Sequence, residues 1–243
     1  NIRGSAVLMA PTGSGKTEAA LLWAVSQGAS RLYYTLPFQA SMNAMEKRLT
    51  EDEKNEQDKI TREAPFKGQV GLEHSRSTLA YYRRLFYENE NADPKQVTKA
   101  AKWLKNLAEL NYYPVRILSP YQLLKAPYRL KGYETLLTDC YGAAFVFDEI
   151  HAYEAARLAK ILALVKHLRE NYNAKFLVMS ATLPKILRES LKDALGDYSL
   201  VTASEDLYRE FRRHELVLRD GELLSEENLN HIADSARGGQ TVL

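Results

Sequence analysis

The sequence predicts an α/β protein: a parallel β-sheet that is flanked by helices in three layers, helix, sheet and helix. Short apolar runs such as residues 143–147 alternate along the chain with segments of helical periodicity such as residues 154–169. An uninterrupted apolar run is typical of a strand that is buried on both faces of a parallel sheet. Strands that alternate with helices are joined by right-handed crossovers, which place the helices over the sheet.

A glycine-rich turn follows the first predicted strand. Residues 6–9 are apolar, residues 10–17 read Ala-Pro-Thr-Gly-Ser-Gly-Lys-Thr, and the residues after them favour a helix to about residue 27. The glycines allow main-chain N–H groups to point inward, and the helix N-terminus adds its positive end. The turn is therefore predicted to cradle phosphate groups.

The same turn supplies the predicted ligands of ATP and Mg²⁺. Lys16 provides a mobile charge for the β- and γ-phosphates, and the Thr17 hydroxyl is placed to bind Mg²⁺. The sequence departs from the usual G-x-x-x-x-G-K-[ST] pattern at Ala10, which still allows a tight exit from the strand. The residues predicted to bind the nucleotide are Gly13, Ser14, Gly15, Lys16, Thr17 and Glu18.

The remaining elements follow in alternation. A second strand is predicted at residues 31–36, and we assign its Tyr33 and Tyr34 to the core rather than to a site. The charged residues 51–63 are expected to form a solvated helix end and a loop. The other predicted strands are residues 69–74, 115–118, 143–147 and 175–179. The other predicted helices are residues 38–49, 77–87, 95–110 and 154–169, a short one from residue 121, and one that starts at Pro184.

The pattern changes near residue 200, which suggests a domain boundary. We predict that residues 1–200 form one domain and that residues 201–243 form a connector and the start of a truncated second domain. This connector contains a predicted strand at residues 216–218 and a helix at residues 226–237. Because both ends of the chain lie close to predicted strands, we expect a piece of a longer protein.

Composition excludes some classes of function. The 243 residues are 45% hydrophobic, so a full core is expected, and the net charge of +2 means that any nucleic-acid surface is local. The single cysteine, Cys140, permits no internal disulfide, which favours a reducing compartment. No apolar run approaches the ~20 residues of a membrane span. A cytoplasmic protein without a membrane partner is expected.

Polar residues also follow two further strands. Asp148 and Glu149 come after residues 143–147, and Ser180-Ala181-Thr182 ends the strand near residue 179. Ligands of open parallel sheets gather outside the carboxyl ends of the strands. Asp148 is predicted to hold Mg²⁺ together with Thr17, and Glu149 to orient and deprotonate the attacking water. A helix N-cap is the alternative role for these two carboxylates.

The order of these motifs resembles motifs I, II and III of superfamily 2 helicases of the DExH kind. The three are the phosphate loop, Asp148-Glu149-Ile150-His151 and Ser180-Ala181-Thr182, and these helicases also carry alanine where Ala10 stands. Residues 36–45, 148–153 and 211–214 further resemble the CRISPR-associated helicase-nuclease of type I systems. The resemblance implies a RecA-like P-loop NTPase domain, the first of two.

The resemblance implies ATP-driven 3′-to-5′ translocation along single-stranded DNA by a protein that an RNA-guided surveillance complex recruits. It makes Lys16, Asp148 and Glu149 catalytic, and it makes His151, Ser180 and Thr182 the link between nucleotide state and DNA grip. Each implied DNA contact has an alternative role as a helix cap or surface residue. These contacts are Pro37, Gln39, Ser41, His74, Arg76, Ser119 and Gln122.

The sequence also departs from this family. It carries neither the clustered His and Asp ligands of an HD nuclease domain nor the second RecA-like domain with its arginine finger. These partners are expected elsewhere in the protein or on a separate chain, and the domain alone is expected to bind ATP weakly and to hydrolyse it poorly. Two other functions stay open: another DExH helicase that acts on RNA or DNA, and a nucleotide-gated scaffold without turnover.

Overall fold

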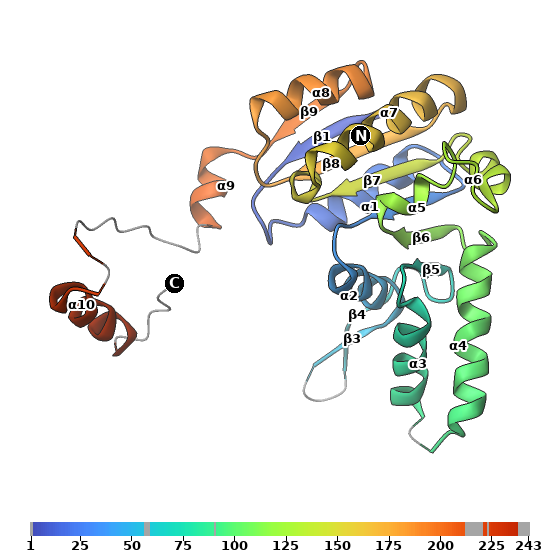
Figure 1. The fold of residues 1–243 in the computed structure, drawn as a ribbon, viewed down its shortest axis with the longest axis horizontal. Helices are drawn as coiled ribbons and strands as arrows, with labels where there is room; N and C mark the ends of the chain where they lie inside the picture. Colours follow the sequence, from blue (N-terminus) through green and yellow to red (C-terminus); the bar gives the residue numbers. More distant parts are fainter. Residues whose placement is uncertain (1, 56–58, 90, 212–220, 223, 238–243) are drawn as a thin grey trace.

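A seven-stranded parallel sheet forms the centre of the protein (Figure 1). The computed structural model describes residues 2–55, 59–89, 91–211, 221–222 and 224–237. The strand order is β5-β6-β2-β7-β8-β1-β9, and every pairing in this sheet is parallel. The strands are β1 (Ala6–Met9), β2 (Leu32–Thr35), β5 (Val70–Glu73), β6 (Val115–Leu118), β7 (Ala144–Asp148), β8 (Lys175–Ser180) and β9 (Ser199–Thr202).

Helices cover both faces of this sheet, which confirms the predicted three-layer fold (Figure 1). Two buried clusters lie between the layers, and successive residues of β2 belong to different ones, Tyr33 to the first and Tyr34 to the second. The first cluster packs beneath α5 (Pro120–Leu123), α6 (Tyr133–Asp139), α7 (Ala155–Tyr172) and α8 (Lys185–Leu195). The second packs beneath α1 (Lys16–Ser26), α2 (Gln39–Thr50), α3 (Ser77–Glu88) and α4 (Pro94–Glu109).

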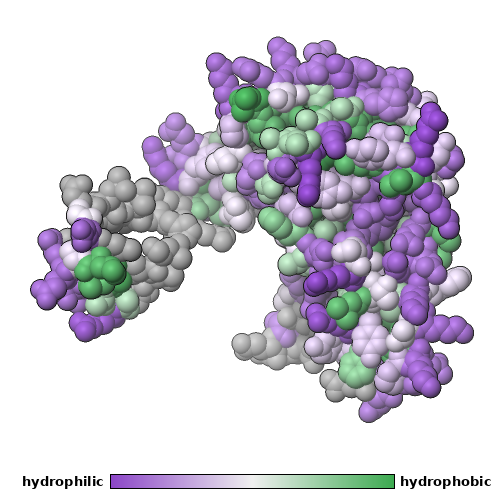
Figure 2. Space-filling model, viewed as in Figure 1, coloured by the Kyte–Doolittle hydropathy of each residue, from purple (hydrophilic) through white to green (hydrophobic). Residues whose placement is uncertain are grey.

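The surface agrees with this layered core. On the face seen in Figure 2, hydrophilic residues cover most of the outer helices, and apolar residues appear between them in small groups. Among the described helices, none is both long enough and apolar enough to cross a membrane.

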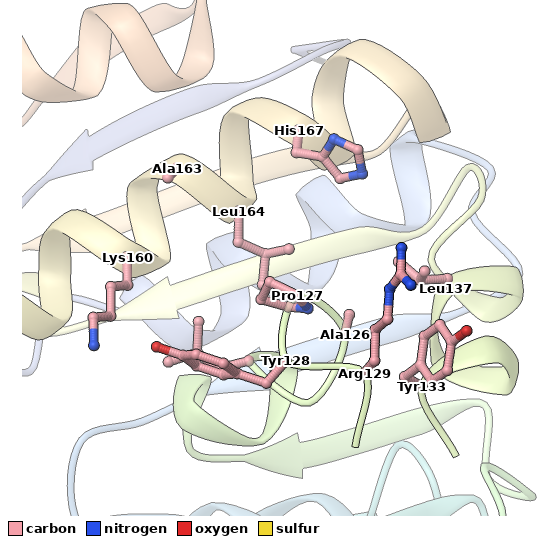
Figure 3. Close-up of a pocket in the computed structure, with 11 residues that line it drawn as sticks. Ala126, Pro127, Tyr128, Arg129, Tyr133, Leu137, Lys160, Ala163, Leu164 and His167 are labelled. Carbon is pink, nitrogen blue, oxygen red and sulfur yellow. The ribbon is translucent and has the colours of Figure 1, made fainter. Parts of the chain in front are cut away.

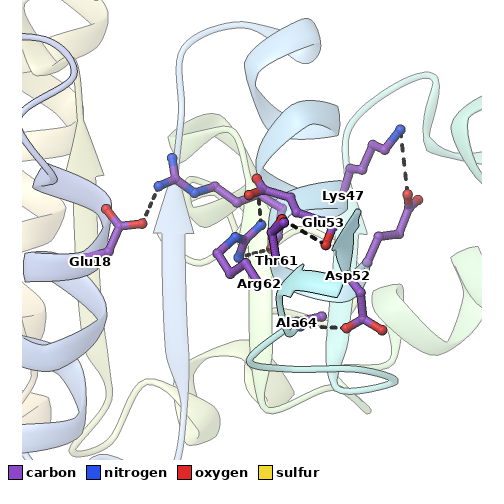
Figure 4. A network of polar contacts seen from close by, with 9 residues as sticks. Glu18, Lys47, Asp52, Glu53, Thr61, Arg62 and Ala64 are labelled. Carbon is purple, nitrogen blue, oxygen red and sulfur yellow. Dashed lines mark hydrogen bonds and ion pairs between the residues drawn. The ribbon is translucent and has the colours of Figure 1, made fainter. Parts of the chain in front are cut away.

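The charged segment after α2 contains a hairpin, which corrects the prediction of a helix end and loop at residues 51–63. Strands β3 (Glu53–Lys54) and β4 (Ile60–Arg62) pair antiparallel. Arg62 donates to the Arg48 main-chain carbonyl at 2.9 Å and pairs with Glu53 at 3.1 Å (Figure 4). Opposite charges spaced across a tight turn can pair between strands, and helical periodicity does not reveal this.

Further elements were also not predicted from the sequence, among them β9, α6 and α9 (Glu205–Glu210). Strand β9 pairs with β1 at the edge of the sheet, where Ser199 and Leu200 are exposed, so its sequence lacks the apolar run of an inner strand. Helix α6 has only seven residues. Pro184 is the N-cap of α8, which therefore begins one residue later than expected.

Beyond the sheet, the structure describes α9 (Glu205–Glu210) and α10 (Glu226–Arg237). The second matches the predicted helix at residues 226–237. The strand predicted at residues 216–218 lies outside the described residues.

A nucleotide site and a row of loops at one edge of the sheet

The strand order places the three predicted nucleotide motifs beside one another. Strands β7, β8 and β1 are neighbours, and they end at Asp148, at Ser180 and just before the phosphate loop. All three strands run in the same direction, so their carboxyl ends meet at one edge. The Ala10 amide donates to the Ser180 carbonyl at 3.3 Å and ties the phosphate loop to the end of β8.

The phosphate loop has the backbone that its glycines predict. Gly13 and Gly15 have φ angles of 90° and 86°, in the left-handed region that glycine adopts without strain. The Lys16 ammonium donates to the carbonyls of Ala10 at 3.0 Å and Pro11 at 3.4 Å. A phosphate group could replace these two carbonyls as the partner of Lys16, so the loop holds a cation ready at the start of α1.

Glu18, which is among the predicted nucleotide-binding residues, forms an ion pair with another side chain. Its carboxylate pairs with Arg48 near the end of α2, and this ion pair links α1 to the hairpin network (Figure 4). Both side chains are exposed, so the pair contributes little to stability.

Asp148 is buried at the end of β7 and is only half satisfied. Its Oδ2 accepts a hydrogen bond from the Tyr34 hydroxyl at 3.0 Å, whereas its Oδ1 is buried and has no hydrogen-bond partner among the described residues. Burial raises the pKa of Asp148, and the hydrogen bond from Tyr34 opposes this shift. A buried carboxylate oxygen without a partner is costly unless a cation or a donor reaches it.

The side-chain oxygens of Thr17 and Asp148 fit the ligand preferences of Mg²⁺. Magnesium prefers hard oxygen ligands and is bound through one or two carboxylates together with phosphate groups and water, rather than by a cage of protein side chains. Thr17 and Asp148 supply a hydroxyl and a carboxylate oxygen on adjoining motifs. The described part of the chain contains no group of three or more His, Cys, Asp and Glu side chains that could hold a metal ion by themselves.

Glu149 adopts a left-handed conformation, with φ 52° and ψ 47°. This conformation costs on the order of 1 kcal/mol or more for a residue other than glycine, and it persists where the surrounding structure enforces it. It ends β7 abruptly and starts the short helix Ile150–Ala152. The Glu149 side chain is half-buried, so its carboxylate reaches solvent beside Asp148.

The residues predicted to couple nucleotide to nucleic acid form a contact across β7 and β8. His151 Nδ1 lies 2.8 Å from Ser180 Oγ and 3.4 Å from a Glu149 carboxylate oxygen. Ser180 Oγ also donates to the Thr182 carbonyl. Thr182 therefore joins this contact through its main chain, while its exposed side chain faces away from the core.

The other half of the same edge carries the predicted nucleic-acid loops. Strands β5, β6 and β2 are neighbours, and they lead into residues 74–76, 119–122 and 37–41. Gln39 donates to the Ser75 hydroxyl at 2.9 Å, and Asn43 contacts His74 Nε2 at 2.8 Å, so two of the three loops are joined directly. The structure thus brings the three loops into one row next to the nucleotide motifs.

The individual side chains in this row differ in exposure. Gln39 and Arg76 are exposed, and Pro37, Ser41 and Gln122 are half-buried. His74 and Ser119 are buried, and burial lowers the pKa of His74. Both ring nitrogens of His74 have partners, because Nδ1 accepts from the Arg76 amide at 3.1 Å. His74 therefore shapes its loop and presents little surface to a ligand.

Sequence reasoning missed several residues of this edge. Tyr34 lies in the core as predicted, but its hydroxyl also contacts Asp148, which was not expected. Phe38 is 60% exposed at the start of α2, and an apolar side chain inside a predicted nucleic-acid loop was the available signal. Tyr208 of α9 donates to the Ala181 carbonyl at 3.3 Å, which no sequence pattern indicated.

A separate pocket of about 600 Å³ lies between residues 124–137 and α7 (Figure 3). Aromatic and basic side chains, including Tyr128, Arg129 and Lys160, line it. None of its lining residues is among the residues predicted to bind the nucleotide or Mg²⁺, to couple the two sites or to contact DNA.

Comparison with known proteins agrees with the order of the motifs. A family model described as DEAD/DEAH box helicase matches residues 2–190. The chain is 28% identical over 231 residues to the CRISPR-associated nuclease/helicase Cas3 of Methanothermobacter thermautotrophicus and 29% identical over 245 residues to a putative Cas3 of Methanocaldococcus jannaschii. These matches cover 91% and 96% of this chain but 25% and 31% of the relatives, so it spans about a quarter to a third of their length.

Solved structures give the same result. The crystal structures of T. fusca Cas3 with ADP and with AMPPNP superpose on 79% of this chain with TM-scores of 0.56 and 0.55, at 25% and 26% identity, and each match covers 21% of the solved chain. These relatives confirm the resemblance to CRISPR-associated helicase-nucleases and the RecA-like fold class. Because the family model matches most of its length, the chain belongs to the DEAD/DEAH box helicase family.

Proposed function

We propose that this chain is the ATP-hydrolysing first RecA-like domain, residues 1–200, of a helicase that translocates 3′ to 5′ along single-stranded DNA. The observation that carries the proposal is the division of one sheet edge into two adjoining halves. Strands β7, β8 and β1 end in the nucleotide motifs. Strands β5, β6 and β2 lead into residues 74–76, 119–122 and 37–41, where Gln39 and Arg76 are exposed. A motor needs these two sites on one rigid body so that each can respond to the other.

Each residue of the nucleotide half has a proposed task. Lys16 and the main-chain N–H groups of the loop bind the phosphates, and Thr17 and Asp148 hold Mg²⁺. The metal, when bound, neutralises the charge that develops on the phosphate oxygens. Glu149 orients the attacking water and accepts its proton. Hydrolysis is expected to be slow in this domain alone, because a second domain completes such a cleft from the other side.

The coupling residues lie at the ends of β7 and β8, within the nucleotide half. His151 contacts both Ser180 and Glu149, so a change at the γ-phosphate can reach the end of β8 through side chains in contact. We infer that the row at residues 37–41, 74–76 and 119–122 binds the DNA backbone through N–H groups, hydroxyls and Arg76. Contacts of this kind suit a motor because they do not depend on base sequence.

The names of the relatives support a proposal for the cellular role. Their names describe CRISPR-associated nuclease/helicases, and this chain matches a quarter to a third of their length. We therefore propose that the chain works in type I CRISPR interference. There, an RNA-guided surveillance complex supplies the displaced strand, and an HD nuclease domain, on the same protein or another, cuts it. Residues 201–243 are proposed to lead toward the second RecA-like domain.

The test is nucleic-acid stimulation of ATP hydrolysis by the full-length protein. Single-stranded DNA is expected to raise the rate at least about tenfold, while blunt duplex DNA and single-stranded RNA of the same sequence have much smaller effects. Equal stimulation by RNA would instead favour a DExH helicase that acts on RNA. No hydrolysis above background with any nucleic acid would favour a nucleotide-gated scaffold.

A further inference from the structure

We propose that Tyr34 is a positioning residue that orients Asp148, one of the two predicted magnesium ligands. The inference rests on the proposed function and extends it to a residue outside the three motifs. Tyr34 lies in the middle of the sheet on β2, next to β7, and it is completely buried. It is not expected to touch the metal or the nucleotide itself.

The hydroxyl of Tyr34 holds Asp148 in a fixed direction. It donates to Asp148 Oδ2 at 3.0 Å, and both side chains are buried. A tyrosine hydroxyl has one proton, and an ionised carboxylate can only accept. The direction of this hydrogen bond is therefore fixed.

The same arrangement selects one oxygen of Asp148. Oδ2 is occupied by Tyr34, whereas Oδ1 is buried without a hydrogen-bond partner in the described part of the chain. The carboxylate therefore cannot rotate freely, and its free oxygen is the one available to a metal ion. Residues behind metal ligands commonly fix ligand orientation in this way.

Tyr34 is also a reliable donor. Burial, followed by the negative charge of Asp148, raises the pKa of Tyr34 well above its ordinary value. The phenol therefore keeps its proton at neutral pH and can donate it to Asp148.

The neighbouring tyrosine provides a matched control. Tyr33 is equally buried on the same strand, but it packs in the other cluster, where its ring stacks on Phe145 and its hydroxyl accepts from Arg116 at 3.4 Å. Tyr33→Phe and Tyr34→Phe each delete one oxygen from β2. Only the second deletion removes a contact with Asp148.

The experiment measures binding of a fluorescent ADP to the full-length protein as the Mg²⁺ concentration is varied. Removing a residue that hydrogen-bonds to a metal ligand typically weakens metal binding ~10–100-fold. In Tyr34→Phe, the half-saturating Mg²⁺ concentration is expected to rise about tenfold or more, while ADP affinity in EDTA stays as in wild type. In Tyr33→Phe, both quantities are expected to stay within about twofold of wild type.

Two results would overturn the inference: an unchanged Mg²⁺ requirement in Tyr34→Phe, or an equal change in Tyr33→Phe. If Tyr34→Phe does not fold, the double variant Tyr34→Phe/Asp148→Ala replaces it. The double variant is expected to melt close to Asp148→Ala, since removing both the donor and the acceptor of a buried hydrogen bond costs less than removing one of them. A double variant as unstable as Tyr34→Phe would refute the contact. If the ADP affinity of the wild-type protein did not depend on Mg²⁺, the proposed function itself would be refuted.

Discussion

Replacing Glu149 by glutamine is expected to slow ATP hydrolysis by a factor of about 10²–10⁴ and to leave ATP affinity within a few-fold of wild type. Glutamine keeps the length of the side chain but cannot accept the proton of the attacking water. The left-handed backbone at Glu149, with φ 52°, imposes a similar cost on both residues, so the loop shape is expected to persist. The variant is therefore expected to accumulate with ATP bound.

The measurement pairs single-turnover hydrolysis with equilibrium binding of ATP, both on the full-length protein with single-stranded DNA present. Glu154→Gln is the matched control, because Glu154 is an exposed carboxylate nearby that pairs with Arg157 at 3.2 Å on the surface. The control is expected to hydrolyse ATP at the wild-type rate. Wild-type hydrolysis by Glu149→Gln would exclude Glu149 as the general base.

Replacing Asp148 by asparagine is expected to have opposite effects on catalysis and on stability. Without the carboxylate charge, Mg²⁺-dependent ATP affinity and hydrolysis are both expected to fall by about 100-fold or more. In the absence of metal, however, the variant is expected to melt a few degrees higher than wild type at pH 7. An ionised carboxylate buried without a partner for Oδ1 costs more than a neutral amide in the same place.

The stability gain is expected to depend on pH. Burial raises the pKa of Asp148, so the folded state binds this proton more tightly than the unfolded state does. The stabilisation from protonation is complete below the unfolded pKa of ~3.9 and is lost as pH rises through the higher folded pKa. The melting temperature of wild type relative to Asp148→Asn is therefore expected to decrease from pH 4 to pH 7.

Thermal unfolding of both proteins across that pH range, in EDTA, tests this expectation. Asp193→Asn serves as the control, because Asp193 is an exposed carboxylate that pairs with Lys166 at 2.8 Å. Its difference from wild type is expected to stay small at every pH. If Asp148→Asn were less stable than wild type at pH 7, the Asp148 carboxylate would be satisfied in the metal-free protein.

Local sequence patterns predicted the parts of the site that lie in single motifs. The two glycines and Lys16 define the phosphate loop by themselves, and the apolar run of residues 143–147 identifies a strand that must end at Asp148. Because all seven strands run parallel, the motifs at their ends had to meet at one edge. The fold class and the nucleotide half of the site could therefore be predicted without the structure.

The contact between Tyr34 and Asp148 could not be predicted in this way. It depends on β2 lying next to β7, which is a property of the strand order and not of either strand. Alternation along β2 then sends Tyr33 and Tyr34 to opposite faces, and only one of them meets Asp148. Two adjacent tyrosines in an apolar strand look alike in the sequence.

Strand β9 and the hairpin β3–β4 were missed for a different reason. Both lie at positions where side chains are largely exposed, so neither carries the apolar pattern that marks a buried strand. Their pairing is fixed by partners, β1 for the edge strand and Arg48 and Glu53 for Arg62 of the hairpin. Hydrophobic periodicity arises from a buried face, so it gives little signal in a strand whose side chains are mostly exposed.

The central claim is that the loop at residues 10–17 and Asp148 form one Mg²⁺·ATP site, and calorimetric titration of the full-length protein with ATP tests it most directly. Wild type is expected to bind ATP with Mg²⁺ present and at least about tenfold more weakly in EDTA. Lys16→Ala is expected to show no measurable binding in either condition, because the only mobile cation of the loop is lost. Lys16→Ala that bound Mg²⁺·ATP as tightly as wild type would contradict the account.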